Sequence, residues 1–403
     1  MSMIQLLLTP DGQRLLTELP PYTPEDVFSL TAQLRKQGYD AELVAAALTQ
    51  NRLRAKATTK FGPFAVTMLF THDGVEQATR LPVAAHHAQR FLQAGSQHVV
   101  DLGCGIGADS IAFAGLGLRV TSIESDTDTA RAAAFNLTAF PEAHIIHADG
   151  RELDLTTFHA DALWLDPARR INGKRLTNPE HWAPPLSLAL ELAASFDAAG
   201  IKVAPGIDYD ILPPQSHVEW TSVDGDLLEA VIWLGNAAPQ PGRSARIIRG
   251  NHTTVFDSES HTPSSPSTTV TPRPLSDYIY EPDPAIIRCG GIAKICQDYD
   301  IAPISDNIAY LTGSHPINSP LVTTFKIHDV LPVEPKKVHA YLAKRNIGIV
   351  EIKKRGTDID PSTWRKKLKL NPHHGGQATL IASPVAGQHR ILVTERYTVA
   401  SDK

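Results

Sequence analysis

The sequence predicts an α/β fold built on a parallel sheet, preceded by a helical segment and followed by a small α+β segment. Three observations carry this prediction. A short apolar strand, a glycine-rich turn and the start of a helix follow one another at 98–109. Further apolar strands then alternate with helical segments, a pattern typical of a parallel sheet covered on both faces. Finally, four of these strands end in an acidic residue.

The glycine turn predicts a nucleotide-binding βαβ unit. Gly103, Gly105 and Gly107 stand at alternate positions directly after the strand. Glycine is needed there because the backbone must turn sharply and approach a ligand without a Cβ in the way. The spacing of Gly103, Gly105 and Ala108 also fits the dinucleotide fingerprint G-x-G-x-x-G/A. Asp101 favours a different ligand, because an acid just before the glycines can accept a hydrogen bond from an ammonium group.

The other strand-end acids extend this pattern. Glu124 follows a second apolar strand and is placed to bind both hydroxyls of a ribose. Asp149 ends a third strand, and Asp166-Pro167 ends a fourth. The alternative for each aspartate is a capping role, because aspartate commonly accepts a hydrogen bond from the first turn of the next helix.

These motifs, in this order, resemble those of class I S-adenosylmethionine-dependent methyltransferases. The N-terminal stretches 8–12, 47–54 and 77–80 look like those of a bacterial methyltransferase family with a THUMP-like C-terminal domain. That family is in turn similar to RNA methyltransferases of the trimethylguanosine synthase type. The resemblance covers nearly the whole chain and implies a Rossmann-like class I methyltransferase sheet.

The resemblance also implies how the cofactor, S-adenosylmethionine, is bound. Asp101 is expected to take the methionine ammonium, and Gly103, Gly105 and Gly107 to lie along the methionine and ribose. Glu124 is expected to accept hydrogen bonds from the ribose hydroxyls. Asp149 is expected to accept one from the adenine amino group.

Asp166, Pro167 and Arg169 form the expected catalytic edge. Methyltransferases that act on exocyclic amines usually carry Asp or Asn, then Pro-Pro and an aromatic that stacks on the base. Here Ala168 and Arg169 replace the second proline and the aromatic. Arg169 can stack its planar guanidinium on a base or hold a phosphate. The motif also resembles that of uridine C5 methyltransferases, but the cysteine they need after the fifth strand is missing from 202–206.

Composition divides the chain into four segments. Residues 1–80 are predicted to form a helical domain, because apolar positions recur at helical spacing between capping and proline signals. Residues 81–250 are the expected methyltransferase domain. Residues 251–274 are rich in turn formers and predict a linker. Residues 275–403 contain new strand and helix patterns, which suit a small α+β, THUMP-like domain.

The charge distribution points to a polyanion. The chain carries a net charge of −5, yet residues 336–369 contain eleven Lys or Arg and three acids, a local charge of +8. A basic patch on an acidic chain is typical of a local nucleic-acid site. The expected RNA-binding residues are Lys353, Lys354, Arg355, Arg365 and Lys366. Trp364 is either a surface for base stacking or part of the core.

The remaining composition predicts a cytoplasmic protein with no membrane segment and no metal site. Only three cysteines occur, and neither they nor the pairs His86-His87 and His373-His374 have zinc-ligand spacing.

The combined prediction is an S-adenosylmethionine-dependent methyltransferase acting on RNA, either tRNA or rRNA, at a base nitrogen. Two alternatives stay open. One is a small-molecule methyltransferase whose flanking domains form a lid. The other is an RNA-binding protein with an inactive methyltransferase core. The sequence does not indicate the oligomeric state.

Overall fold

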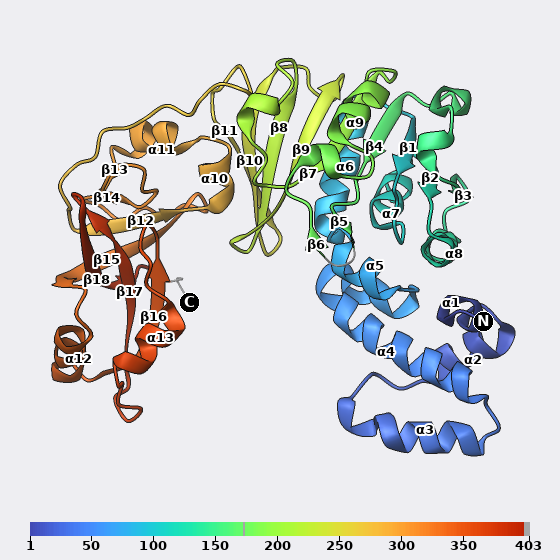
Figure 1. The fold of residues 1–403 in the computed structure, drawn as a ribbon, viewed down its shortest axis with the longest axis horizontal. Helices are drawn as coiled ribbons and strands as arrows, with labels where there is room; N and C mark the ends of the chain where they lie inside the picture. The colour runs from blue at the N-terminus through green and yellow to red at the C-terminus, as the bar shows by residue number, and fades with distance from the viewer. Residues whose placement is uncertain (172–173, 399–403) are drawn as a thin grey trace. The chain divides into compact units, whose positions relative to one another are not determined.

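The computed structural model describes residues 1–171 and 174–398, and these form two compact units (Figure 1). Of the described residues, the first unit contains those within Met1–Val203 and Val231–Pro239, and the second contains those within Ala204–Ala230 and 240–398. This division is coarser than the four predicted segments and falls earlier than residue 250. The four-part division stays a prediction.

The first unit begins with helices, as predicted. They are α1 (Met3–Leu7), α2 (Pro10–Glu18), α3 (Val27–Lys36), α4 (Ala41–Phe61) and α5 (His72–Gln77), with short 3₁₀ turns η1 (Pro24–Asp26) and η2 (Gly62–Thr67). Asp40 caps α4 by accepting hydrogen bonds from the backbone of Glu42 and Leu43. The buried side chains of these helices share one core with Ile106 and Ala132. The helical segment therefore packs directly on the sheet domain.

The sheet domain of the first unit is the predicted parallel sheet. Its strands are β1 (His98–Leu102), β2 (Arg119–Glu124), β3 (Ala143–His147), β4 (Ala162–Leu165) and β7 (Ala198–Val203). They run in the order β7-β4-β1-β2-β3, and each neighbouring pair is parallel. The helices of this domain are α6 (Leu81–Gln93), α7 (Ala108–Gly115), α8 (Thr127–Asn136) and α9 (Leu186–Ala193).

One face of this sheet carries a dense aromatic core. Phe91 of α6 and Phe113 of α7 pack edge-on against Trp164 of β4. Trp233, near the end of β9 (Asp226–Gly235), lies 5.8 Å from Trp164 between ring centroids. Gly200 of β7 makes room for both indoles, because a Cβ there would lie 2.7 Å from each ring. Helices α6 and α7 therefore cover β4 and β7 through close ring contacts.

A hairpin follows β7 in the chain. β8 (His217–Val223) and β9 are neighbours in the sheet and are joined at Asp224-Gly225. Both turn residues have positive φ, 51° and 94°, as a two-residue type I′ turn requires. β10 (Gly242–Arg249) pairs with β8 in parallel and with β11 (His252–Asp257) antiparallel. The predicted linker thus contains a strand, which forms because Val255 and its threonine neighbours favour extended structure beside β10.

The rest of the second unit is an α+β fold with a seven-stranded sheet (Figure 1). The strand and helix patterns expected in 275–403 are present, among them β15 (Val322–Pro332), α12 (Pro335–Lys344) and β16 (Ile347–Lys354). The other strands are β12 (Tyr278–Pro282), β13 (Ala302–Pro303), β14 (Leu311–Gly313), β17 (Gly376–Val385) and β18 (Gln388–Arg396), and the other helices are α10 (Pro284–Arg288), α11 (Ile292–Tyr299) and α13 (Pro361–Lys367). Among the described residues of both units, no helix is long and apolar enough to cross a bilayer.

Candidate active site

The glycine turn lies at the carboxyl end of β1, as the sequence predicts. Gly103, Gly105 and Gly107 all have left-handed φ values of 80°, 57° and 85°, which favour glycine. A Cβ on Gly103 would lie 3.2 Å from the carbonyl oxygen of Asp166, whereas one on Gly105 would meet no atom within 4 Å. The loop therefore lies against the end of β4 on one side and borders open space on the other.

Asp101 is buried beneath this loop. Its side chain is on β1, and the residue is only 1% exposed. The Ser110 hydroxyl donates to Oδ2, while Oδ1 has no hydrogen-bond partner among the described residues. Burial, reinforced by the nearby charge of Asp109, raises the pKa of Asp101 well above its usual value. A buried, unsatisfied carboxyl oxygen is costly unless a ligand supplies a donor, and a cationic donor suits it best.

Glu124 lies at the end of β2, opposite the same loop. Its Oε2 accepts from the backbone amide of Gly105 at 3.0 Å, and its Oε1 accepts from the amide of Asp126 at 2.8 Å. These two backbone hydrogen bonds fix the carboxylate at the rim of the glycine turn. The structure thus brings together the second predicted acid and the predicted glycines.

Asp149 follows β3 and has a structural role in addition to any binding role. It accepts from the backbone amide of Arg151 and forms a 2.5 Å ion pair with the Arg151 guanidinium. Hydrogen bonds from the Arg151 side chain and then from the Arg151 backbone amide lower the pKa of Asp149 to about 2. Asp149 therefore caps the short 3₁₀ turn η3 (Gly150–Glu152), as the capping alternative predicts.

Asp166 lies at the end of β4, next to the glycine turn. The ammonium of Lys202, on the neighbouring strand β7, donates to Asp166 Oδ2 at 2.7 Å. The Lys202 side chain is 6% exposed, while that of Asp166 is 26% exposed. The pair is thus anchored in the protein at the lysine and reaches the surface at the carboxylate.

Arg169 follows in the loop after β4. This loop is held by reciprocal backbone hydrogen bonds between Ala168 and Ala183. The Nη1 atom of Arg169 is buried and has no hydrogen-bond partner in the described part of the chain. Pro167 is also buried. The predicted catalytic residues therefore follow one another directly after β4, and Arg169 carries an unsatisfied cationic donor.

Behind Asp166 lies a buried polar network that the sequence prediction missed. Lys202 Nζ also donates to Thr79 Oγ1 at 2.9 Å, and Thr79 donates to Asp109 Oδ2 at 2.7 Å. His87 Nδ1 binds Asp109 Oδ1 at 2.8 Å. All four residues are at most 6% exposed. A lysine within the apolar strand 201–203 was the available signal, because a buried lysine requires a partner.

The C-terminal basic residues differ in their environments. Lys354, Arg365 and Lys366 are exposed. Lys353 is instead paired with Glu281 at 2.7 Å, and the Arg355 guanidinium lies 5.2 Å from the centre of the Tyr310 ring. Glu281 lies on β12 and Tyr310 directly precedes β14, so both basic side chains contact residues far away in the sequence.

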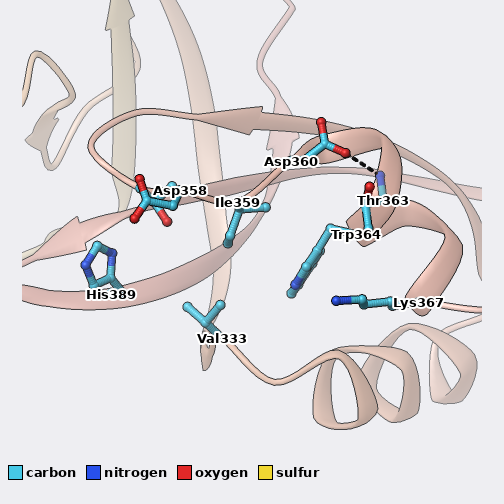
Figure 2. A pocket seen from close by; sticks show the side chains of 9 residues that line it. Val333, Asp358, Ile359, Asp360, Thr363, Trp364, Lys367 and His389 are labelled. Atoms are coloured by element: carbon cyan, nitrogen blue, oxygen red, sulfur yellow. Dashed lines mark hydrogen bonds between the residues drawn. The ribbon is translucent and has the colours of Figure 1, made fainter.

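Trp364 is not a stacking surface. It is 6% exposed and belongs to a core cluster with Leu368 and Leu380. Figure 2 shows its indole beside Lys367 in an open pocket of about 600 Å³. Of the two alternatives left open for Trp364, the structure shows the core position, because α13 turns its apolar side, with Trp364 and Leu368, into the core.

Histidines and cysteines do not gather into a metal centre in the described ranges 1–171 and 174–398, where no group of three or more potential ligands occurs. His87, one of the pair noted in the sequence, binds Asp109 instead.

Comparison with known proteins bears on the fold and on the class of protein. A family model described as THUMP domain-like matches residues 322–396, and one described as a domain of unknown function matches residues 1–57. An uncharacterised S-adenosylmethionine-dependent methyltransferase of Mycobacterium tuberculosis, found in two strains, is 29% identical over 327 residues, which cover 79% of this chain and 87% of the relative. The crystal structure of a proposed methyltransferase from Porphyromonas gingivalis W83 has a TM-score of 0.72 at 20% identity and covers 94% of this chain and 100% of that chain.

The parallel sheet, its glycine turn and this structural likeness define a class I methyltransferase fold. With the mycobacterial relative, they identify the chain as an S-adenosylmethionine-dependent methyltransferase. Residues 322–396 form its THUMP-like domain.

Proposed function

We propose that this protein transfers a methyl group from S-adenosylmethionine to a base nitrogen of an RNA, either tRNA or rRNA, in the cytoplasm. The observation that carries the proposal is the position of Asp166-Pro167 directly against the glycine turn, with the Asp166 carboxylate reaching the surface. A carboxylate there can accept a hydrogen bond from an amine placed next to the cofactor.

The cofactor would be held by the strand-end residues. Asp101 would accept from the methionine ammonium, which supplies the donor that Oδ1 lacks. The cation would also stabilise the charged form of a carboxyl whose pKa burial raises. Glu124 would accept from the ribose hydroxyls at the rim of Gly103, Gly105 and Gly107. Asp149 would accept from the adenine amino group while it keeps its bond to Arg151.

Bound S-adenosylmethionine supplies a methyl group that its positive sulfur has already activated. The protein's contribution is therefore mainly alignment, and good alignment can contribute on the order of 7 to 11 kcal/mol. Asp166 would accept an N–H of the target amine and so point the nitrogen lone pair toward the methyl carbon. Pro167 would shape the edge, and the Arg169 guanidinium would stack on the base or hold a phosphate. The nitrogen–carbon bond forms as the sulfur–carbon bond breaks, and the amine proton leaves to solvent.

An RNA substrate is supported by the second unit. It carries a THUMP-like domain and a local excess of basic side chains, of which Lys354, Arg365 and Lys366 are exposed. A small-molecule methyltransferase has no need for such a surface. An RNA-binding protein with an inactive core has no need for the ordered Asp166–Lys202 pair.

The proposed function is tested with purified protein, S-adenosylmethionine carrying a labelled methyl group, and bulk tRNA and rRNA. Label is expected in RNA, at an N-methylated nucleoside after digestion. Calorimetry is expected to show stronger binding of S-adenosylmethionine than of NAD. Tight cofactor binding without labelled RNA would favour a small-molecule substrate, and RNA binding without cofactor binding would favour the inactive-core alternative.

Replacing Glu124 with alanine is expected to weaken S-adenosylmethionine binding by about 1 to 3 kcal/mol, because the ribose hydroxyls lose a charged acceptor. The measurement is calorimetric titration of the cofactor. Glu152→Ala is the matched control, because it removes a carboxylate from the nearby turn η3. Equal affinity in the Glu124→Ala variant and the unaltered protein would contradict the ribose contact.

Replacing Lys354, Arg365 and Lys366 together with alanine is expected to weaken RNA binding. Each phosphate contact releases counterions, so the slope of log affinity against log salt should become shallower by about two. Affinity is measured by filter binding across a salt series. Removing Lys336, Lys337 and Lys344 of α12 is the control, since it removes the same charge from the same domain. Equal effects in both triple variants would indicate a general charge effect with no specific surface.

A further inference from the structure

We propose that Lys202 is a positioning residue that holds the Asp166 carboxylate in place for methyl transfer, and that Thr79 of the N-terminal helical segment completes this hold. The inference rests on the proposed function and extends the active site to residues outside the strand-end motifs. Its evidence is the chain of buried hydrogen bonds from Asp166 to His87.

Chemistry fixes the direction of this chain. A lysine ammonium can only donate, so Thr79 Oγ1 must accept from Lys202. The Thr79 hydroxyl therefore has its own proton available for Asp109 Oδ2, 2.7 Å away. Hydrogen bonds from His87 and Thr79, with the charge of Lys202, lower the pKa of Asp109 although burial raises it. Asp109 is thus an ionised acceptor that orients Thr79 toward Lys202.

The same chain also supports the strand that carries Asp166. The His87 ring lies against Trp164, with ring centroids 4.3 Å apart. Trp164 precedes Asp166 by two residues at the end of β4. His87 thus contacts this strand through the indole, while Lys202 holds the carboxylate from β7. Asp166 is therefore restrained through both its backbone and its side chain.

Thr79 is itself fixed in place by Lys60 at the end of α4. The Lys60 ammonium donates to the carbonyls of Glu76 and Ala78, each at 2.7 Å. Burial, with the nearby charge of Lys202, lowers the pKa of Lys60 to about 8. The two hydrogen bonds tie the backbone just before Thr79 to the end of α4, which supports the position of the Thr79 hydroxyl at Lys202. The helical segment thus contributes a side chain to the catalytic edge.

The Asp166 carboxylate needs such a restraint because it is partly exposed to solvent. Asp166 is one quarter exposed, so without a partner its side chain can rotate into solvent. A displacement of about 1 Å in an aligning group can lower turnover on the order of a hundredfold. Lys202 prevents this rotation by occupying one carboxylate oxygen and leaving the other to face the substrate.

The test uses two isosteric variants of the full chain. Lys202→Met, which keeps the stem and removes the ammonium, is expected to lower kcat about a hundredfold. Thr79→Val, which removes only the hydroxyl, is expected to lower kcat about tenfold. The Kd for S-adenosylmethionine should change less than threefold in both. Thr79→Ser keeps the hydroxyl and is expected to recover most of the kcat lost in Thr79→Val.

A double-mutant cycle then separates positioning from a general structural effect. If Lys202 acts through Asp166, Lys202→Met should add little further loss of kcat in an Asp166→Ala background. Additive losses, or Thr79→Ser being as slow as Thr79→Val, would overturn the inference.

Crystal structures of the unaltered protein and of Thr79→Val and Lys202→Met give a readout that needs no activity. The Asp166 carboxylate is expected to leave its position in Lys202→Met, and the Lys202 ammonium to shift in Thr79→Val. Superimposable carboxylates in Lys202→Met would overturn the inference even if RNA proves not to be the substrate. Conversely, an unaltered protein that methylates no RNA would contradict only the proposed function. Thr79→Val keeps the test decisive if Lys202→Met fails to fold.

Discussion

Asp166→Ala is expected to lower kcat for RNA methylation about a hundredfold or more while S-adenosylmethionine binds with nearly unchanged affinity. The variant removes the acceptor that orients the target nitrogen, a contact made only as the substrate reacts. The measurement is single-turnover methyl transfer at saturating cofactor, combined with calorimetric titration of the cofactor.

Asp154→Ala is the control for this variant, because Asp154 is an exposed carboxylate that caps the turn η4 (Leu155–Phe158) away from the glycine loop. It is expected to methylate at the rate of the unaltered protein. Asp166→Ala also removes the carboxylate that accepts from the Lys202 ammonium, so the thermal unfolding of the variant is measured alongside. A folded Asp166→Ala protein with full turnover would remove Asp166 from the mechanism.

Asp109→Ala is expected to lower the free energy of unfolding by about 3 to 5 kcal/mol. The substitution removes the buried acceptor of both His87 and Thr79, and removing one partner of a buried ion pair is strongly destabilising. The measurement is urea unfolding followed by circular dichroism. Asp149→Ala breaks a surface pair with Arg151 and removes the cap of the turn η3, and it is expected to cost only about 1 kcal/mol. Equal costs for the two would contradict a buried, mutually dependent network.

The same residue predicts how stability depends on pH. The pKa of Asp109 is lower in the folded than in the unfolded protein. The contribution of Asp109 to the free energy of unfolding is therefore fully present above the pKa of an aspartate in the unfolded chain, about 4. It is lost as the pH falls through the folded pKa. The unaltered protein should therefore lose stability in acid more steeply than Asp109→Asn. Parallel acid profiles would show that the Asp109 carboxyl has the same pKa folded and unfolded.

Local sequence determined the elements that depend on neighbouring residues. The glycine turn after β1 followed from glycines at alternate positions, and each has the positive φ that such a turn requires. The hairpin at Asp224-Gly225 followed from its turn residues in the same way. Glu124 and Asp166 each end a strand, and the carboxyl ends of adjacent parallel strands meet at one edge of the sheet. Their position beside this turn therefore followed from the sequence.

Tertiary structure decided which side chains are paired and which are exposed. Composition predicted RNA contacts for Lys353, but Lys353 is paired with Glu281. Composition also left Trp364 either exposed or in the core, and the structure places its indole in the core. Partners so distant in the sequence leave no local pattern that reveals them.

The support for Asp166 was likewise decided by the fold. Thr79, Asp109 and Lys202 lie on three different elements, and only packing of the helical segment on the sheet brings them within hydrogen-bond distance. Taken alone, Thr79 is an ordinary polar residue of a loop, Asp109 of a helix and Lys202 of a strand. The strand-end motif that contains Asp166 could thus be recognised in the sequence. The network that orients the Asp166 carboxylate depends on burial, because buried polar groups must find hydrogen-bond partners wherever the folded chain supplies them.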